Sequence, residues 1–201
     1  VTVMSEKVKI QIDGKEITAE KVRNLMLVAK ENEIFIPSLC YYEHIDPPLS
    51  SCRVCTCKIN GKFGPACTEK VEDGLEVEVN TEMLRDTRKA LVEMMFAEGN
   101  HVCPACEKSG ECDLQHMGYE LGISSIRFPH LFKDRVIDYK PSRIVMEHNR
   151  CIKCLRCVVD VLTNDGKRVF NYQDRGNETF VGVDYTQEAR LSDEEVLRAM
   201  K

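Results

Sequence analysis

Ten of the eleven cysteines in this chain fall into three groups with the spacing of metal ligands, and Cys57 alone is left over. Thiolate sulfur is a soft ligand that holds iron in a sulfide cage or zinc in a tetrahedral site. Loops that supply so many ligands must fold around them, so these groups constrain the fold more than any other feature. The candidate ligands are Cys40, Cys52, Cys55 and Cys67 in the first group, His101, Cys103, Cys106 and Cys112 in the second, and Cys151, Cys154 and Cys157 in the third.

The composition is that of a globular protein with reduced thiols. Hydrophobic residues make up 43% of the 201 residues and charged residues 30%, with a net charge of −5 and no basic stripe. We therefore expect no nucleic-acid partner. The longest apolar stretch, residues 90–97, is interrupted by Glu93, so we expect no membrane span. The N-terminus has no signal-peptide core, which predicts a cytoplasmic protein whose cysteines bind metal rather than form disulfides.

Sequence patterns predict three units, which cover residues 1–80, 81–130 and 131–201. In the first unit, alternating apolar residues over 7–19 predict a hairpin that turns at Asp13-Gly14. Residues 21–32 have the period of a helix, with Val22 on its apolar face. Strands are expected over 53–60 and 75–79. The first unit is thus predicted to be a mixed sheet with one helix packed across it.

The second and third units carry the other two cysteine groups in loops. Thr81 is placed to cap a long helix that ends at Gly99, with Met94 and Met95 filling the core. Ser192 starts a final helix that is still running at the last residue, which indicates that the sequence has been cut. The remaining elements are expected as helices over 111–121 and 158–162 and as strands over 143–147, 169–172 and 179–183.

The first group has the spacing C-x11-C-x2-C-x11-C, with one close pair and two distant single cysteines. A 2Fe-2S cluster needs four thiolates, and a close pair on one loop can serve one side of it. The alternative is zinc, although structural zinc usually takes two close pairs. Cys57 lies on the strand that leaves this loop, and we expect it to be a small buried hydrophobic residue and not a ligand.

The second group has the spacing His101-x-Cys103-x2-Cys106-x5-Cys112. One imidazole and three thiolates can hold a 4Fe-4S cluster, and a neutral imidazole makes the cluster less negative than four thiolates would. His101 is favoured because the three cysteines lack a fourth local thiolate. His116 is the competing histidine, and it lies on the helical side after Cys112.

The third group has the spacing Cys151-x2-Cys154-x2-Cys157. The bacterial ferredoxin run would continue with x3-C-P, but Val161 and Leu162 occupy those two positions. The fourth ligand is therefore remote, or lies beyond the end of this sequence, or is absent because the cluster is 3Fe-4S. The local substitutes for it, all of them poor, are His148, Asp160 and Cys57.

Six stretches carry a more specific pattern: Ile36-Pro37-Ser38-Leu39-Cys40-Tyr41, Cys52-Arg53-Val54-Cys55, Arg88-Lys89-Ala90-Leu91-Val92-Glu93, Phe96-Ala97-Glu98-Gly99-Asn100-His101, Cys103-Pro104-Ala105-Cys106-Glu107-Lys108-Ser109-Gly110 and Arg150-Cys151-Ile152-Lys153-Cys154. Their order resembles the N-terminal part of the large iron–sulfur subunit of complex I, which recurs in NAD-dependent formate dehydrogenases and iron-only hydrogenases. The sequence is most similar to the small diaphorase subunits of soluble NAD-reducing nickel–iron hydrogenases. In those subunits, as here, the histidine lies two residues before the first cysteine.

The resemblance implies an α+β protein with a β-grasp plant-type ferredoxin domain, a helical segment with one-His/three-Cys ligation, and a bacterial-ferredoxin-like C-terminal domain. It implies one 2Fe-2S cluster and two 4Fe-4S clusters on the three groups, with the fourth ligand of the third cluster lost by truncation. The chain would be a non-catalytic electron-transfer subunit of a heteromultimeric oxidoreductase. Its partners would be a flavin and NAD-binding diaphorase subunit and nickel–iron hydrogenase subunits.

What the sequence lacks agrees with that role. It has no G-x-G-x-x-G motif, no P-loop and no further CxxC pair to hold a nickel–iron centre. Two alternatives stay open. The chain could be the corresponding part of complex I or of a formate dehydrogenase, or it could be a zinc-stabilised interaction scaffold, which visible absorbance would distinguish. An independent redox enzyme is disfavoured because no substrate motif is present.

Overall fold

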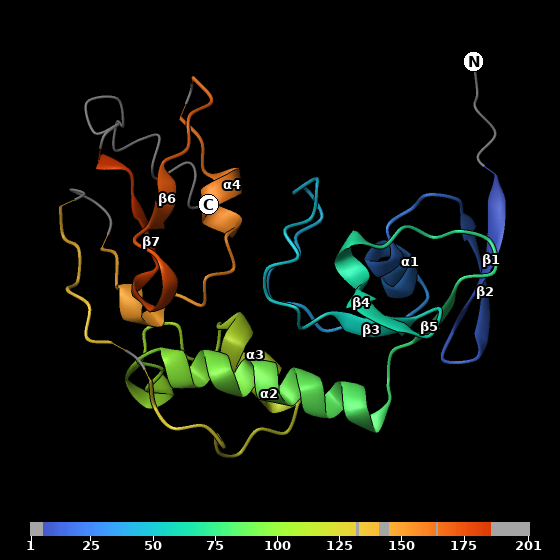
Figure 1. The fold of residues 1–201 in the computed structure, drawn as a ribbon, viewed down its shortest axis with the longest axis horizontal. Helices are drawn as coiled ribbons and strands as arrows, with labels where there is room; N and C mark the ends of the chain where they lie inside the picture. Colours follow the sequence, from blue (N-terminus) through green and yellow to red (C-terminus); the bar gives the residue numbers. More distant parts are fainter. Residues whose placement is uncertain (1–5, 132, 141–144, 164, 186–201) are drawn as a thin grey trace.

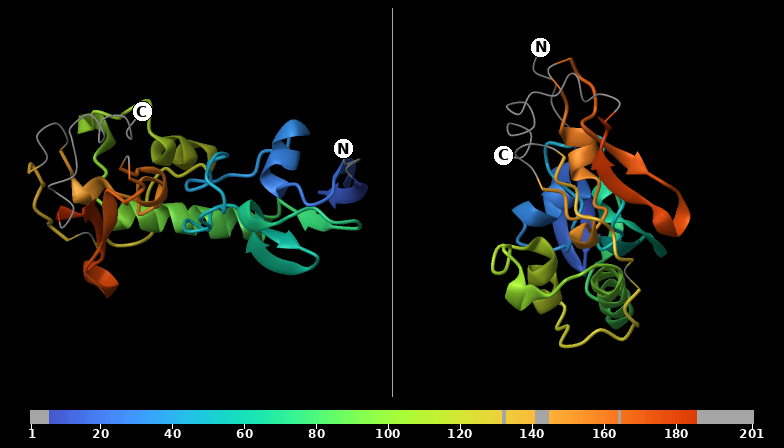
Figure 2. Two further views of the ribbon diagram at one scale, coloured as in Figure 1. Left: turned by 90° about the horizontal axis from the view of Figure 1, so that it is seen from above. Right: turned by 90° about the vertical axis from the view of Figure 1, so that its left-hand side faces the viewer.

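The computed structural model of the chain describes residues 6–131, 133–140, 145–163 and 165–185. One long helix, α2 (Glu82–Glu98), joins two sheet-containing units that lie at its opposite ends (Figure 1 and Figure 2). No helix among the described residues has both the length and the apolar composition needed to cross a membrane. The expected helix from Ser192 lies outside the described residues, as do positions 143 and 144 of the expected strand over 143–147.

The first unit is a five-stranded sheet in the order β2-β1-β5-β3-β4. β1 and β5 pair in parallel, and the other neighbours are antiparallel. The hairpin turns at Asp13-Gly14 as predicted, and both residues have positive φ, 47° and 79°, as a two-residue type I′ turn requires. The strands are β1 (Lys7–Ile12), β2 (Lys15–Glu20), β3 (Thr56–Ile59), β4 (Lys62–Pro65) and β5 (Glu76–Glu78).

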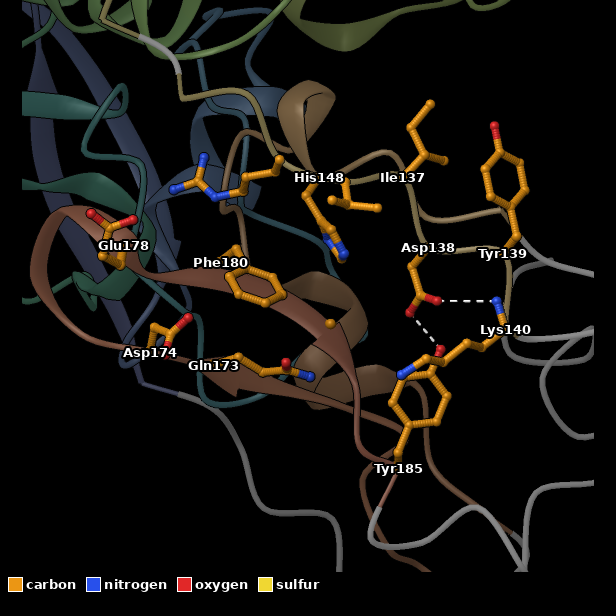
Figure 3. A pocket seen from close by; sticks show the side chains of 13 residues that line it. Ile137, Asp138, Tyr139, Lys140, His148, Gln173, Asp174, Glu178, Phe180 and Tyr185 are labelled. Carbon is orange, nitrogen blue, oxygen red and sulfur yellow. Dashed lines mark hydrogen bonds between the residues drawn. The ribbon is translucent and has the colours of Figure 1, made fainter.

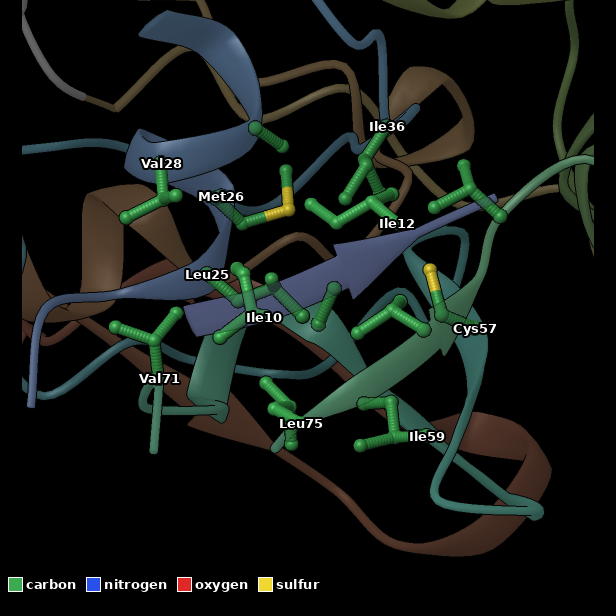
Figure 4. Close-up of a cluster of buried hydrophobic side chains, with 14 of the residues drawn as sticks. Ile10, Ile12, Leu25, Met26, Val28, Ile36, Cys57, Ile59, Val71 and Leu75 are labelled. Carbon is green, nitrogen blue, oxygen red and sulfur yellow. The ribbon is translucent and has the colours of Figure 1, made fainter. Parts of the chain in front are cut away.

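The core of this unit lies between the sheet and the helix α1 (Leu25–Glu31). The two-residue period of β1 buries Ile10 and Ile12, which belong to the same apolar cluster as Leu25 and Val28 of the helix (Figure 4). Cys57 is a fully buried member of this cluster, as the sequence predicts. One face of the sheet is therefore buried against α1, and the cysteine-bearing loops lie at the end of the sheet.

The helix α1 begins four residues later than expected. Asn24 is its N-cap, and the side-chain oxygen of Asn24 accepts a hydrogen bond from the Met26 amide at 2.9 Å. Val22 is 54% exposed and has a φ of 67°, so its expected place on the apolar face of the helix is wrong. The reason is tertiary, because the Val22 amide donates to the Val71 carbonyl and holds this segment against a distant loop.

The helix α2 begins and ends where the sequence predicts. The Thr81 hydroxyl accepts a hydrogen bond from the Leu84 amide at 3.3 Å and caps the first turn. Gly99 ends the helix in an extended conformation, with φ −125°, rather than the left-handed one common at this position. A Cβ atom on Gly99 would lie 2.4 Å from Nε2 of His101 and 2.6 Å from the carbonyl oxygen of Asn149. Glycine is therefore needed for close packing.

The buried face of α2 differs from the expected one. Met95 packs against the apolar cluster beside the helix, but Met94 is 41% exposed, so its expected core position is wrong. Glu93 is fully buried instead, and its Oε2 pairs with Nε of Arg127 at 2.6 Å. The segment that carries Arg127 covers this side of the helix and supplies the charge that a buried carboxylate needs.

The second sheet-containing unit packs β6 and β7, an antiparallel pair, against a short helix, α4. Leu155 precedes α4 in a left-handed conformation, with φ 67°, and Leu162 pairs with Arg168 in an isolated bridge. The expected helix over 158–162 is thus shifted toward the N-terminus. The remaining elements are α3 (Asp113–Glu120), α4 (Arg156–Asp160), β6 (Phe170–Gln173), β7 (Phe180–Val183) and the 3-10 helices Ala66–Thr68, Cys103–Ala105, His148–Arg150 and Gly176–Glu178.

Asn24 joins two elements of the first unit, which gives a stability prediction. Besides capping α1, its Nδ2 donates to the Cys67 carbonyl at 2.6 Å. We expect Asn24→Ala to lower the free energy of unfolding by about 1–2 kcal/mol, because both bonds are lost. Asn24→Ser is the matched control, since it keeps a capping oxygen and should cost less. Equal losses in chemical denaturation of the two variants would contradict the role of the cap, because both variants lack the bond to the Cys67 carbonyl.

Candidate iron–sulfur sites

The four cysteines of the first group come from three loop segments and meet inside the first unit. Cys40 follows α1, Cys52 and Cys55 lie on the loop that enters β3, and Cys67 lies on the 3-10 helix Ala66–Thr68. All four are buried. The Cys40 sulfur is within hydrogen-bonding reach of the Cys52 and Cys67 sulfurs, and the Cys55 sulfur is within reach of that of Cys67. The structure thus brings the whole predicted ligand set together.

These contacts lower the pKa of two of the four thiols and raise the pKa of the other two. Hydrogen bonds from Cys52 and Cys67 lower the pKa of Cys40, and a hydrogen bond from Cys67 lowers the pKa of Cys55 to about 7. The contact with Cys40 raises the pKa of both Cys52 and Cys67. A metal cluster takes all four as thiolates, so loading this site must release protons.

Left-handed residues shape the loop that carries the close pair. Ser50 has a φ of 51° and Arg53 a φ of 60°, on either side of Cys52. Backbone of this kind turns amide groups toward a common side, which suits a negatively charged cluster. The Ser50 hydroxyl is buried and has no hydrogen-bond partner among the described residues, so it can donate to a group held in this loop. The donor set and the loop therefore fit a 2Fe-2S cluster.

The second group lies on the connection from α2 to α3. Cys103 and Cys106 stand at the two ends of the 3-10 helix Cys103–Ala105, and Cys112 is the N-cap of α3. The three cysteines are half-buried. Nη1 of Arg150 lies 3.6 Å from the Cys106 sulfur and donates to it. This donor places a positive charge beside the second group.

The imidazole of His101 is buried beside the end of α2. Its Nε2 is buried and has no hydrogen-bond partner among the described residues, and burial lowers the pKa of the ring. A buried neutral ring with an unpartnered nitrogen suits a metal ligand. Phe96 packs edge-on against the ring, with centroids 5.6 Å apart. The competing His116 lies on the exposed side of α3, where its Nε2 is 3.9 Å from Glu120.

The third group lies on the loop from the 3-10 helix His148–Arg150 into α4. Its cysteines are half-buried, and burial raises the pKa of Cys151 and raises that of Cys157 to about 11. Lys153 and Leu155 alternate with the cysteines and are left-handed, with φ 54° and 67°. One of these turns directs the Lys153 amide to the Cys151 sulfur at 3.4 Å. Amide donors of this kind are suited to thiolates that ligate iron.

The structure places each local substitute for the missing fourth ligand beside another partner. His148 Nδ1 lies 3.1 Å from a backbone carbonyl of β7. Asp160 Oδ2 lies 3.0 Å from Nε2 of His44, which belongs to the first unit. The Cys57 sulfur lies 3.6 Å from Nη2 of Arg88, and burial raises the pKa of this thiol to about 11.

A hollow of about 700 Å³ lies beside β6 and β7, on the side of His148 (Figure 3). Asp138 accepts hydrogen bonds there from the Tyr185 hydroxyl and, at 3.0 Å, from the Lys140 amide. None of the cysteines lines this hollow. It is therefore separate from the three ligand groups.

One apolar cluster beside α2 contacts members of all three groups. Cys40 and Cys52 belong to it, and Cys112 and Cys154 of the other two groups pack against it. The Ser51 hydroxyl also donates to the Cys154 carbonyl at 3.0 Å, which ties the first group to the third. The other buried members are Leu39, Val54, Val92, Leu114 and Met117. The three groups are thus neighbours around one apolar core.

The described residues contain no group of three or more His, Cys, Asp or Glu side chains placed to hold a single metal ion. What they offer are sulfur-rich donor sets on loops. The sequence did not predict the contacts that Ser51, Arg88 and Arg150 make with these sulfurs or loops. Those contacts cross 103, 31 and 44 residues of chain, so no local pattern indicates them.

Comparison with known families assigns iron–sulfur binding to the regions that carry the first two ligand groups. Residues 5–82 match the model of the 2Fe-2S iron-sulfur cluster binding domain. Residues 88–127 match the model of the NADH-ubiquinone oxidoreductase-G iron-sulfur binding region. These matches favour iron–sulfur clusters over the zinc alternative.

The chain is similar over nearly its whole length to the gamma subunit of the NAD-reducing hydrogenase HoxS of Cupriavidus necator. The two sequences are 46% identical over 194 residues, which cover 96% of this chain and 82% of that subunit. The chain belongs to the family of NAD-reducing hydrogenase gamma subunits. It is therefore an iron–sulfur electron-transfer protein and a subunit of an oxidoreductase.

Two further comparisons agree with this family. A crystal structure of an NAD⁺-reducing [NiFe]-hydrogenase in the H₂-reduced state contains a chain with a TM-score of 0.81 and 32% identity. The match covers 88% of this chain and 74% of that one. The mitochondrial 78 kDa subunit of the NADH-ubiquinone oxidoreductase of Neurospora crassa is 29% identical over 181 residues. Those residues cover 88% of this chain but only 24% of the 78 kDa subunit.

The close approach of His101 to Gly99 gives a prediction for this site. We expect Gly99→Ala to lower the free energy of unfolding by about 1–3 kcal/mol, because the new Cβ displaces the imidazole or the Asn149 carbonyl. Gly64→Ala is the matched control, since the nearest atom to its Cβ, Cδ1 of Ile59, is 3.8 Å away. Thermal unfolding measures both. Equal behaviour of the two variants would show that the contact at Gly99 is not tight.

Proposed function

We propose that this chain carries electrons between nickel–iron hydrogenase subunits that oxidise hydrogen and a flavin-containing diaphorase subunit that reduces NAD⁺. The observation that supports this most is the single apolar cluster packed against cysteines of all three groups. A chain that only used metal to stabilise separate domains would have no need to gather its ligand loops around one core. The similarity to NAD-reducing hydrogenases supports the choice of partners.

We assign one 2Fe-2S cluster to the first group and 4Fe-4S clusters to the second and third groups. The four converging sulfurs support the first assignment, and the unpartnered Nε2 of His101 supports the second. The third group supplies three thiolates on a loop with an amide donor. The ligands proposed are Cys40, Cys52, Cys55 and Cys67; His101, Cys103, Cys106 and Cys112; and Cys151, Cys154 and Cys157.

The finer architecture follows the same assignment. A five-stranded mixed sheet with α1 across one face supports a β-grasp ferredoxin domain for residues 1–80. The α2–α3 region, 81–130, forms the segment with one-His/three-Cys ligation. The unit built on α4, β6 and β7, within 131–201, is proposed to be the bacterial-ferredoxin-like domain.

Bound clusters would supply the capacity to accept and release single electrons. The residues of this chain bind them, keep water away and set the charge around them. Buried sulfurs in the first group and the apolar cluster beside α2 exclude water. Arg150 adds positive charge at the second group. Hydrogen splitting and hydride transfer to NAD⁺ are left to the partner subunits.

His101 offers a test of the second ligand set. We expect His101→Cys to retain a 4Fe-4S cluster but to lower its reduction potential, because a fourth thiolate adds negative charge that disfavours the reduced state. Redox titration followed by EPR measures this. His116→Ala is the control and should leave the potential unchanged, because His116 lies on the exposed side of α3. An unchanged potential in a loaded His101→Cys variant would remove His101 from the ligand set.

Reconstitution with the two partners tests the function itself. The chain alone should reduce no NAD⁺ under hydrogen, because it supplies neither flavin nor nickel. With the hydrogenase partner alone, hydrogen should produce the EPR signals of reduced clusters in this chain. With both partners, hydrogen-dependent NAD⁺ reduction should appear. The proposal would be contradicted if the partners reached full activity without this chain.

A further inference from the structure

Arg88 is a buried cation on the inner face of α2, directly behind the strand that leaves the first cysteine loop. Arg88 is only 3% exposed. Nη1 donates to the Val79 carbonyl and Nη2 to the Thr56 carbonyl, both at 2.8 Å. Nη2 also lies 3.6 Å from the Cys57 sulfur. The guanidinium therefore contacts the backbone carbonyl of the residue that directly follows the ligand Cys55.

No carboxylate among the described residues forms an ion pair with Arg88. Asp13 is the carboxylate whose charge acts on it, but Oδ1 of Asp13 accepts from the Val79 amide at 2.7 Å and from the Asn80 amide at 3.4 Å. Nε of Arg88 is buried and has no hydrogen-bond partner among these residues. The two carbonyl bonds satisfy part of the guanidinium, and no carboxylate among the described residues bonds it directly.

A charge in this position needs a compensating charge. Removing an unpaired ion from water costs several kcal/mol, so buried arginines are normally matched by a carboxylate or another anion. Nη2 of Arg88 contacts the Thr56 carbonyl and the Cys57 sulfur, and both of these residues lie within two positions of the ligand Cys55. The positive charge of Arg88 therefore lies beside the first cysteine loop.

We propose that Arg88 is the buried counter-charge of the 2Fe-2S cluster and raises its reduction potential. This inference rests on the assignment of that cluster to the first group. A cluster held by four thiolates is negative, and reduction adds one more negative charge. A fixed cation behind the loop stabilises the reduced form more than the oxidised form.

The test is a redox titration of the 2Fe-2S EPR signal in the full chain carrying its clusters. Arg88→Gln removes the charge and retains an amide that can donate to the Val79 carbonyl. We expect its equilibrium constant for one-electron reduction to fall about tenfold, the scale of one charge acting through a partly screened interior. Tenfold corresponds to a shift of about 59 mV toward more negative potential.

Three controls separate charge from packing. Arg88→Lys keeps the charge and should stay near the wild-type potential. Arg85→Gln removes a charge from an exposed position of the same helix and should change nothing. Cys57→Ala removes the sulfur contact but not the cation, so it should also keep the potential.

The outcomes are distinguishable. A loaded Arg88→Gln chain with the wild-type potential overturns the proposal, and so does an equal shift in Arg88→Gln and Arg88→Lys. If Arg88→Gln loses the cluster, Arg88→Lys decides: retention at the wild-type potential supports the counter-charge, whereas loss in both shows that the guanidinium is a structural bridge only. A wild-type chain without a 2Fe-2S signal rejects the cluster assignment and with it the role of Arg88.

Discussion

Cysteines from all three groups pack against one apolar cluster beside α2, and the rest of the arrangement depends on this packing. The ligand loops have little regular structure of their own, and loops without such support lose too much conformational entropy to hold a fixed geometry. The long helix α2 supports these loops because its buried side chains pack against both sheet-containing units. The unit of β1 to β5 lies near the start of α2, and the unit of β6 and β7 lies near its end (Figure 1). Ligand loops that lie far apart in sequence thereby become neighbours.

Arginines provide the polar counterpart of this apolar packing. Arg88 of α2 donates a hydrogen bond to the Thr56 carbonyl of β3. Arg150, beside the third group, donates to the sulfur of Cys106 in the second group. Arg156 lies 3.1 Å from Asp113 of α3, and its guanidinium stacks over the Tyr42 ring at 5.0 Å, so it connects all three regions. An acidic chain with a net charge of −5 thus places cations beside its cysteine loops. Positive charge near a bound cluster would favour the reduced form of that cluster.

The sequence was sufficient for features that are local. Ligand spacing, the Asp13-Gly14 turn and the Thr81 cap are each encoded within a few neighbouring residues, and the structure contains the turn and the cap. The start of α1 and the exposure of Met94 were not predictable, because each is decided by a distant segment. Val71 holds the chain before α1, and the segment with Arg127 determines which face of α2 is buried.

Gly99 shows how a correct boundary can have a different cause. Its sequence position predicts the end of α2, and the helix does end there. The backbone is extended, however, and the position needs glycine because the His101 ring and a distant carbonyl lie against it. Arg88 belongs to one of the six stretches that carry the family resemblance, but no local pattern predicts its burial or its contacts with β3. Tertiary contacts around the ligands are thus the part of the site that sequence patterns describe least.

Metal and acid-labile sulfide analysis, combined with Mössbauer spectroscopy of the anaerobically purified chain, tests the central claim most directly. We expect iron and sulfide in nearly equal amounts and spectra of both 2Fe-2S and 4Fe-4S type: the two groups with four ligands each account for about six irons, and the third group, with three thiolates, adds at most about four more. Zinc in place of iron, or iron without sulfide, would contradict it.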